Sequence, residues 1–447
     1  MAAEEEDMCR VCFGDEEDGP LVQPCACRGS AKLIHKHCLE RWRRTGGRED
    51  AAYRCGQCMD YYHDALSIEL LSARLQAKRT NGEDTVFTLD TLATELQALG
   101  KYDEAEPLLR EALEVTRARL GSRHPNTLGS IHNLGALLYH KGDFAAAEPL
   151  LREALKEQRE VLGNLHPHTL LSISSLGLLL KAKGGKRNLA AAERKLQEAL
   201  KTRCETLGSR HPNTLSSISN LGMLLLTKRD FAAAVPLLRQ ALEGRRETLG
   251  NRHPDTLTSI SNLVRLLRSK CGKGDLAAAE LLLREELEGR RETLGNRHRS
   301  TLNCINNLGL LLKEKSNIAA AVPLFREALE GLRETLGNRH RSTLNCINCL
   351  GAMLVAKGDL AAAVPLCREA LEGLRETLGN RHPDTLDSIN CLGTLLMAKG
   401  DLAAAEPLLR EALEGRCETL GNRHPDTLGS IDHLDILLEA KGDLGAA

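Results

Sequence analysis

Seven cysteines and one histidine between residues 9 and 58 stand in closely spaced pairs that could bind metal ions. In order, the pairs are Cys9 and Cys12, Cys25 and Cys27, His35 and Cys38, and Cys55 and Cys58. Zn2+ prefers thiolate and imidazole ligands, and each pair can bind one ion from a tight turn. Because eight ligands complete two tetrahedral sets, no position is left for a bound water. The pattern therefore predicts two structural zinc ions and no catalytic one.

A disulfide framework is the alternative interpretation of these cysteines, and it requires an oxidising compartment. The chain opens with Met1-Ala2-Ala3 followed by acidic residues, without the basic start and apolar run of a signal peptide. This short segment, with Trp42 as the only Trp of the chain, cannot bury a core sufficient to fold unaided. We therefore expect zinc binding to supply free energy of folding.

The order of the ligands resembles the motif of the RING-CH (RING-variant) zinc-finger family, C-x2-C, C-x-C, H-x2-C, C-x2-C. The stretch PCACRGSAKLIHKHCLERW, from Pro24 to Trp42, is similar to the core of that family. The PHD finger uses the same ligand types, but it separates the third and fourth ligands by two residues and places an aromatic residue just before the seventh. Here one residue separates them, and Trp42 follows the sixth ligand. The resemblance covers about an eighth of the chain.

The resemblance implies that the ligands interleave in a cross-brace. One ion would be held by Cys9, Cys12, His35 and Cys38, and the other by Cys25, Cys27, Cys55 and Cys58. His37 is the alternative imidazole, but its position next to Cys38 would strain a shared tetrahedron, which favours His35.

The resemblance also implies a RING-type E3 ubiquitin-protein transferase that forms no covalent intermediate. Such a module holds a ubiquitin-conjugating enzyme beside a substrate, so its catalysis is mainly proximity and orientation. By position in the motif, the contact surface would include Val11, Trp42, Gly56 and Gln57, although Val11 and Trp42 could instead pack the small core. Met59 stands where many RING-type ligases have a basic residue that steadies ubiquitin, which implies weak or selective activity.

The rest of the chain repeats itself. The phrase LGxxHPxTL and its variants recur with a histidine at positions 124, 166, 211, 253, 298, 340, 382 and 424, which are 42 or 45 residues apart. Each repeat has two amphipathic segments, such as TLGSIHNLGALLYHKG and DFAAAEPLLREALKEQREVLG. The pattern predicts two helices per repeat and hence an α-solenoid. We expect the repeated histidine to have a structural role in its loop.

Glycine, aspartate and asparagine mark the expected helix ends. Gly142, Gly358 and Gly400 are predicted to close first helices. Second helices are predicted to be capped by Asp143, Asn188, Asp230, Asp275, Asn317, Asp359 and Asp401. Insertions of three residues near Gly185 and Gly272 are expected to lengthen the turns between helices. A proline in the second turn of most second helices, such as Pro149, predicts a bend.

The order Leu-Gly, Ala, Leu and Ala, at 134–135, 147, 151 and 154, resembles the tetratricopeptide (TPR) pattern. The period and the LGxxHPxT loop are similar to those of kinesin light chains, and the resemblance covers about four fifths of the chain. It implies a groove for a partner peptide, lined by first helices and including Asn133, Asn220, Asn262 and Asn307. The alternative is that these amides only bridge neighbouring helices.

We therefore expect a mainly α protein with three segments: a two-zinc cross-brace RING-variant module at 1–62, a linker or capping helix at 63–84, and about eight helix-turn-helix TPR repeats at 85–447. Within the second segment, the leucine spacing predicts a helix over roughly 64–78. A formal net charge of −1 gives no bias toward nucleic acid. No apolar run is long enough to span a membrane. Without a signal peptide, and with cysteines suited to a reducing compartment, we expect a cytoplasmic or nuclear protein.

Two functions remain. The favoured one is a zinc-binding E3 ubiquitin-protein ligase, in which the RING-CH module recruits a ubiquitin-conjugating enzyme and the TPR array recruits a protein or peptide substrate. The alternative is a non-catalytic scaffold, in which the zinc module is another protein-binding surface.

Overall fold

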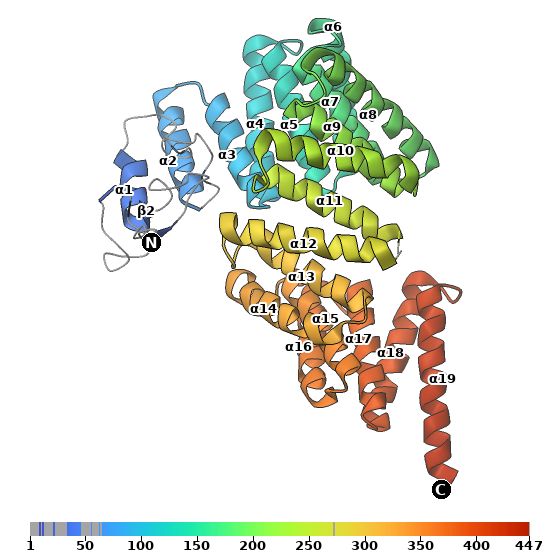
Figure 1. Ribbon diagram of the computed structural model, residues 1–447. Coiled ribbons are helices and arrows are strands. Elements are labelled where there is room, and N and C mark those ends of the chain that lie inside the picture. Colours follow the sequence, from blue (N-terminus) through green and yellow to red (C-terminus); the bar gives the residue numbers. More distant parts are fainter. Residues whose placement is uncertain are drawn as a thin grey trace, which may run out of the picture. The chain divides into compact units, whose positions relative to one another are not determined.

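The structure, a computed structural model, describes residues 9, 11–12, 21–22, 34–45, 55, 62, 65–270 and 273–446. In these residues the chain forms nineteen helices and two short strands, so the prediction of a mainly α fold is confirmed. The chain divides into two compact units, Met1–Asp230 and Phe231–Ala447 (Figure 1).

The first unit begins with a small module around one strand pair and one helix. Strand β1 (Leu21–Val22) pairs antiparallel with β2 (Ile34–His35), and helix α1 (Lys36–Thr45) follows β2 directly. Its described core consists of Cys9, Ile34, Cys38, Leu39, Cys55 and Tyr62, with Trp42 packed against it. Since half of these core residues are cysteines, the apolar surface that the module buries is small.

Helix α2 (Ala65–Asn81) corresponds to the helix expected over roughly 64–78, and it is anchored to the module. Arg43, which is buried, donates a 2.6 Å hydrogen bond to Ser67 Oγ, and its guanidinium lies 4.6 Å from the centre of the Tyr62 ring. Arg44 forms a 2.8 Å ion pair with Glu69. Because α2 also contacts α3, it connects the module to the first repeat.

The remaining helices come in pairs, each packed on the next within its unit. In the first unit they are α3 (Val86–Ala98), α4 (Tyr102–Leu120), α5 (Pro125–Lys141), α6 (Phe144–Val161), α7 (Pro167–Lys183), α8 (Lys186–Leu207) and α9 (Pro212–Thr227). In the second unit they are α10 (Phe231–Leu249), α11 (Pro254–Lys270), α12 (Lys273–Leu294), α13 (Arg299–Glu314), α14 (Ile318–Leu336), α15 (Arg341–Lys357), α16 (Leu360–Leu378), α17 (Pro383–Ala398), α18 (Leu402–Leu420) and α19 (Pro425–Ala446).

Small residues set the close approach of the two helices in a repeat. In α5, a Cβ on Gly135 would lie 2.9 Å from Leu151 Cγ of α6, closer than carbon atoms approach. Ala147 and Ala154 of α6 are fully buried, as are Leu128 and Leu151. The residues of the Leu-Gly, Ala, Leu and Ala pattern are therefore those at which the two helices pack together.

The repeated histidine caps the first helix of every repeat after the first, in which Thr85 precedes α3. His124 precedes α5, and its Nδ1 accepts a 3.2 Å hydrogen bond from the backbone N–H of Asn126. The same bond, at 3.1 to 3.3 Å, is made by His166, His211, His253, His298, His340, His382 and His424. The bond satisfies a backbone donor that the first turn of the helix leaves unpaired. The structural role predicted for this histidine is confirmed.

The predicted lengthening of the turns is wrong. Two residues separate α7 from α8, as two residues separate α5 from α6, whereas α8 has 22 residues and α6 has 18. The insertion therefore extends the start of the second helix, where its backbone gains helical hydrogen bonds. Helix α12 also has 22 residues.

The extension moves the expected caps into the helix, so Asn188 and Asp275 lie in the first turn of α8 and α12. By contrast, Asp143, Asn317, Asp359 and Asp401 each accept a hydrogen bond from the backbone N–H three residues later, as predicted. Prolines such as Pro149 lie inside continuous helices, and the bend expected there stays a prediction.

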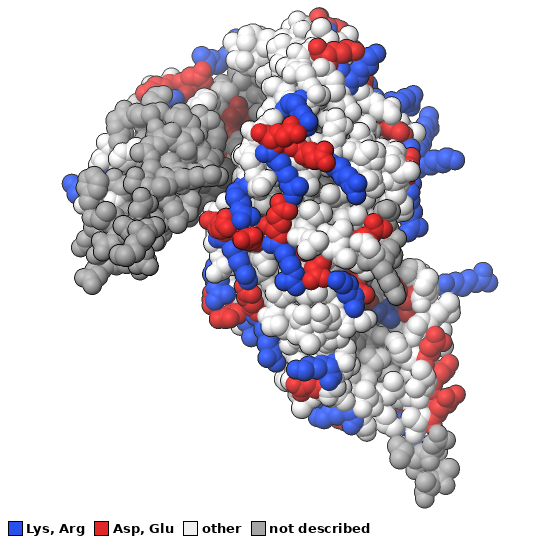
Figure 2. Space-filling model, viewed as in Figure 1, with Lys and Arg blue, Asp and Glu red and all other residues white. Residues whose placement is uncertain are grey.

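Charged side chains cover the outside of the helices in alternating signs. The face drawn in Figure 2 shows Lys and Arg interspersed with Asp and Glu. Many form ion pairs from one repeat to the next, such as Arg117 with Glu153 at 3.3 Å and Lys141 with Glu106 at 2.9 Å. None of the described helices is long and apolar enough to cross a membrane.

Candidate functional site

The structure brings together four of the predicted zinc ligands: Cys9, Cys12, His35 and Cys38. Their ligand atoms all lie within 4.8 Å of one another. Tetrahedral zinc with thiolate bonds of about 2.3 Å requires separations of about 3.8 Å between sulfur atoms, so the cluster fits a zinc ion after small shifts. Two of the ligands lie close together in the chain, since His35 ends β2 and Cys38 lies in the first turn of α1.

The electrostatics of the cluster agree with a cation site. Burial raises the pKa of the Cys9 thiol, but backbone hydrogen bonds at Cys12, His35 and Val11 favour the thiolate, and together with Cys12 Sγ they bring that pKa to about 6. Burial, followed by the hydrogen bond with Cys12, raises the pKa of Cys38 to about 12. Neighbouring thiols oppose one another's ionisation, and a divalent cation removes that conflict.

His35 rather than His37 belongs to the cluster. The His35 side chain is buried, and its Nδ1 lies 3.1 Å from Cys12 Sγ. His37 is exposed, stacks on His35 with ring centres 5.1 Å apart, and has its Nε2 3.3 Å from Cys38 Sγ. The placement of these two rings therefore agrees with the ligand set in which His35 binds the metal.

Much of the second predicted set lies outside the described residues. Cys25, Cys27 and Cys58, and with them Gly56 and Gln57 of the expected contact surface, are not among the residues that the structure describes. Cys55 is described, and it is buried in the same core as Cys9 and Cys38.

The two described residues of the expected contact surface differ in exposure. Val11 is 45% exposed, so its side chain is available to another protein. Trp42 is partly buried and packs against the core, while part of the ring stays accessible. The packing of Trp42 agrees with a role in the small core, and its contact with a conjugating enzyme stays a prediction.

The four predicted groove asparagines fall into different surroundings. Asn133 of α5 hydrogen-bonds Asp90 of α3, so this amide bridges neighbouring helices. Asn220 lies half-buried on α9. Asn262 of α11 and Asn307 of α13 line one pocket of about 540 Å3 in the second unit. The binding of a partner peptide by these amides therefore stays a prediction.

Among the pocket residues that were not singled out from the sequence, two depart from the pattern of the repeats. Val264 stands where other first helices have the glycine of the repeat, such as Gly135, and Glu286 stands where other second helices have a buried alanine, such as Ala154. A comparison of the repeats position by position would have marked both as exceptions.

Comparisons with known families match both parts of the chain. The RING-variant domain family matches residues 9–58. Two families described as tetratricopeptide repeat match the rest: one at 84–156, 128–187, 268–334 and 341–418, the other at 169–213 and 214–255. The first of these two covers more than half of the chain.

Among curated proteins, the chain is 42% identical over 59 residues to the E3 ubiquitin-protein ligase MARCHF5 of Xenopus laevis, which is 12% of this chain and 21% of that protein. It is 39% identical over 56 residues to the E3 ubiquitin-protein ligase MARCHF4 of Homo sapiens, which is 12% of this chain and 13% of that protein. The chain thus spans about a fifth or less of the length of these relatives.

Among solved structures, the apo form of the quorum sensor NprR from B. thuringiensis superposes with a TM-score of 0.54 at 13% identity, over 78% of this chain and 92% of that chain. A protein from Podosopora anserina, described as a kinesin light chain with nearly identical TPR-like repeats, is 27% identical over 46% of this chain and 95% of that chain, with a TM-score of 0.39. The likeness to NprR concerns the fold alone.

Proposed function

Because the chain belongs to the tetratricopeptide-repeat family and has a RING-variant domain at its N-terminus, we propose that it is an E3 ubiquitin-protein ligase. The observation that carries the proposal is the cluster of Cys9, Cys12, His35 and Cys38 in a RING-variant module. The alternative of a non-catalytic scaffold would use the same fold, so activity must be measured directly.

The proposed module holds two zinc ions in a cross-brace. Cys9, Cys12, His35 and Cys38 hold one ion, and Cys25, Cys27, Cys55 and Cys58 hold the other. When bound, the metal supplies folding free energy to a core that buries little apolar surface. Four protein ligands per ion leave no open coordination position, so the role of the metal is structural.

The proposed mechanism is positioning. Val11 and Trp42, with Gly56 and Gln57, form the surface that binds a ubiquitin-conjugating enzyme. The module then holds the thioester of that enzyme close to a substrate amine, which raises the effective concentration of the two reactants and needs no covalent intermediate on this chain.

The proposed role of the TPR array is to recruit the substrate protein. Helix α2 supports this division of labour, because the contacts of Arg43 and Arg44 with Ser67 and Glu69 attach it to the module while it also packs on α3. A short ordered connection restricts the distance between a conjugating enzyme and a substrate held on the first repeats.

Autoubiquitination by the full chain, with a panel of conjugating enzymes, tests the proposal. We expect ubiquitin chains that disappear with a zinc chelator and fall at least tenfold in Trp42→Ala, because an aromatic anchor at an interface typically contributes more than about 1.4 kcal/mol. Arg41→Ala, an exposed substitution on the same helix, is the matched control.

The zinc content and helicity of each variant would be measured beside activity. A zinc-loaded, folded protein that is inactive with every conjugating enzyme would contradict the ligase and favour the scaffold. Activity that survives in Trp42→Ala would keep the ligase and remove Trp42 from the contact surface.

A further inference from the structure

The pocket of about 540 Å3 in the second unit is formed by three successive helices, α11, α12 and α13. Asn262 and Arg265 of α11 and Asn307 of α13 contribute polar side chains, and Val264 and Leu283 contribute apolar ones. Glu286 of α12 adds a carboxylate that is only 2% exposed.

Val264 gives a physical reason for a pocket at this repeat. In the equivalent position of other repeats, a Cβ on Gly135, Gly177 or Gly393 would lie 2.7 to 2.9 Å from a leucine of the second helix. A valine side chain cannot be accommodated at that distance, so Val264 requires more room between α11 and α12 than the glycine of the other repeats does.

Glu286 is the second exception among the repeats. The corresponding residues of the other seven second helices are all alanine: Ala112, Ala154, Ala199, Ala241, Ala328, Ala370 and Ala412, each fully buried. A buried carboxylate costs free energy unless both oxygens are hydrogen-bonded or paired. At this position α12 therefore has a group that needs partners, where the other second helices have an inert methyl group.

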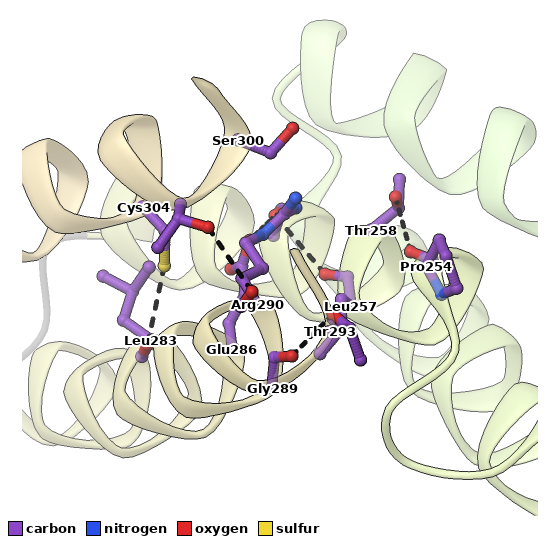
Figure 3. Close-up of polar contacts among 12 residues, drawn as sticks. Pro254, Leu257, Thr258, Leu283, Glu286, Gly289, Arg290, Thr293, Ser300 and Cys304 are labelled. Atoms are coloured by element: carbon purple, nitrogen blue, oxygen red, sulfur yellow. Dashed lines mark hydrogen bonds and ion pairs between the residues drawn. The ribbon is translucent and has the colours of Figure 1, made fainter. Parts of the chain in front are cut away.

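Among the residues that the structure describes, only one oxygen of Glu286 has hydrogen-bond partners. Its Oε1 accepts hydrogen bonds from Arg290 Nε at 2.7 Å and from Ser261 Oγ at 2.5 Å. Its Oε2 is buried and has no hydrogen-bond partner among the described residues. Figure 3 shows Glu286 and Arg290 on α12, with Leu283 on the same helix and Cys304 on the next. Glu286 lines the pocket, and its unpartnered oxygen calls for a hydrogen-bond donor.

The charges around the pocket disfavour a cation, and the unpartnered oxygen of Glu286 favours a group that can donate a proton. Arg268 pairs with Glu314 through two hydrogen bonds, and Arg290 pairs with Glu286. Arg265 is exposed and has no ion pair within the described chain. An added cation would be repelled by this arginine. An added carboxylate would be attracted by Arg265, but it has no proton to donate to Glu286 Oε2.

A carboxamide satisfies both requirements. Its N–H2 can donate to Glu286 Oε2, while its carbonyl oxygen can accept from Arg265 or from the amides of Asn262 and Asn307. Its methylene groups can pack on Val264 and Leu283. We propose that this pocket binds a Gln or Asn side chain of the partner protein. This inference rests on the proposed recruitment of a protein by the TPR array, and it names the side chain recognised.

The test uses the full chain with labelled valine and leucine methyl groups and follows Val264 and Leu283 by NMR. The probes are N-acetyl-glutamine-N-methylamide and the corresponding lysine, glutamate and leucine derivatives, which share one backbone. We expect the glutamine derivative at millimolar concentration to shift these methyl signals, and the other derivatives to bind several-fold more weakly.

Two substitutions restore residues that the other repeats contain, so both variants are expected to fold. Glu286→Ala should weaken binding of the glutamine derivative about tenfold or more, because it removes a hydrogen bond to a charged group. Arg203 and Arg245 lie four residues after Ala199 and Ala241, as Arg290 lies four residues after Glu286. Two other repeats therefore combine this arginine with an alanine. Val264→Gly should weaken binding by closing the pocket. Arg284→Ala, exposed on the same helix, is the control and should change nothing.

Three results would overturn the inference. Equal shifts from all derivatives would show that only the peptide backbone binds. Stronger binding of the lysine or glutamate derivative would show that the pocket prefers a charged side chain. The absence of shifts in the folded protein would show that the pocket binds none of these groups. Autoubiquitination of Glu286→Ala, which keeps the zinc module unchanged, separates failure here from failure of the ligase.

Discussion

The zinc-finger module and the repeat array bury their residues by different means. In the module, the described core combines Ile34, Leu39 and Tyr62 with cysteines that also form the metal cluster. In the array, each repeat buries a set of leucines and alanines, and similar contacts recur from one repeat to another. The comparison shows two ways to stabilise a chain with few aromatic residues: a metal ion with fixed ligands, or repetition of one small interface.

Removal of the metal should unfold the zinc-finger module and leave the repeat array folded, which is the largest difference that we expect between the two regions. We expect a chelator, or Cys12→Ser, to unfold the module and abolish autoubiquitination, because the ligands must hold a metal for the small core to fold. The helical signal of the array in circular dichroism should remain nearly unchanged. Zinc content per chain and ligase activity are the measurements.

Cys204→Ser is the control for this substitution, since Cys204 is exposed on α8, far along the sequence from the cluster. Loss of zinc from Cys204→Ser, or full zinc content in Cys12→Ser, would contradict the assignment of the ligands.

In the array, His132 should make stability depend on pH. This side chain is buried in α5 with its Nδ1 2.8 Å from Ser172 Oγ, and burial, with the charge of His168, lowers its pKa to about 4. In the unfolded chain the same histidine has a pKa of about 6.5, so protonation below that pH favours the unfolded state. The free energy of unfolding is therefore highest above about pH 6.5 and decreases as the pH falls toward 4. The loss is on the order of 3 kcal/mol.

Chemical unfolding of the wild type and of His132→Gln between pH 4 and 7 measures this loss, with zinc removed from both proteins so that only the array is compared. The difference between the two proteins should shrink or change sign at low pH. A difference that is independent of pH would show that His132 titrates in the folded state as it does in the unfolded chain.

Two glycines of α5 test the close packing within a repeat. Gly135→Ala should destabilise the first unit by about 1 to 3 kcal/mol, because its methyl group would meet Leu151 at 2.9 Å. Gly129→Ala should instead stabilise by about 0.5 to 1 kcal/mol, since a Cβ there meets nothing within 4 Å and alanine favours the helix. Thermal unfolding of the two variants should therefore shift in opposite directions.

The ion pairs between repeats should contribute least. Arg117 and Glu153 are each about half exposed, so the coupling energy in a double-mutant cycle to alanine should be about 0.2 to 1 kcal/mol and should fall in high salt. A coupling energy that is large and independent of salt would show that these pairs, rather than apolar packing, hold the repeats together.

The sequence predicted the array well because its information is local and repeated eight times. The spacing of Leu128, Ile131 and Leu134 predicted a helix, and the helix is present. The insertions near Gly185 and Gly272 were interpreted wrongly, because glycine is compatible both with a longer turn and with the position just before a helix. The backbone of α8 resolves this choice, since this helix has 22 residues where α10 has 19.

For the candidate site, the spacing of cysteines predicted the metal chemistry, and the resemblance to a family supplied the interleaved pairing. The choice between His35 and His37 depends on which ring faces Cys9 and Cys12, and chains of similar spacing could place either one. Antiparallel pairing of β1 with β2 turns His35 inward. The asparagines were harder, because an amide suits both bridging and binding, and only their neighbours distinguish Asn133 from Asn262.

The sequence by itself determined the periodic helices, a structural role for the repeated histidine and the presence of a metal-binding segment, because each depends on residues close together in the chain. Only the tertiary structure decided that Val264 and Glu286 share one pocket and that Glu286 Oε2 lacks a partner there. These facts depend on how α11, α12 and α13 pack, and packing joins side chains that no local pattern relates.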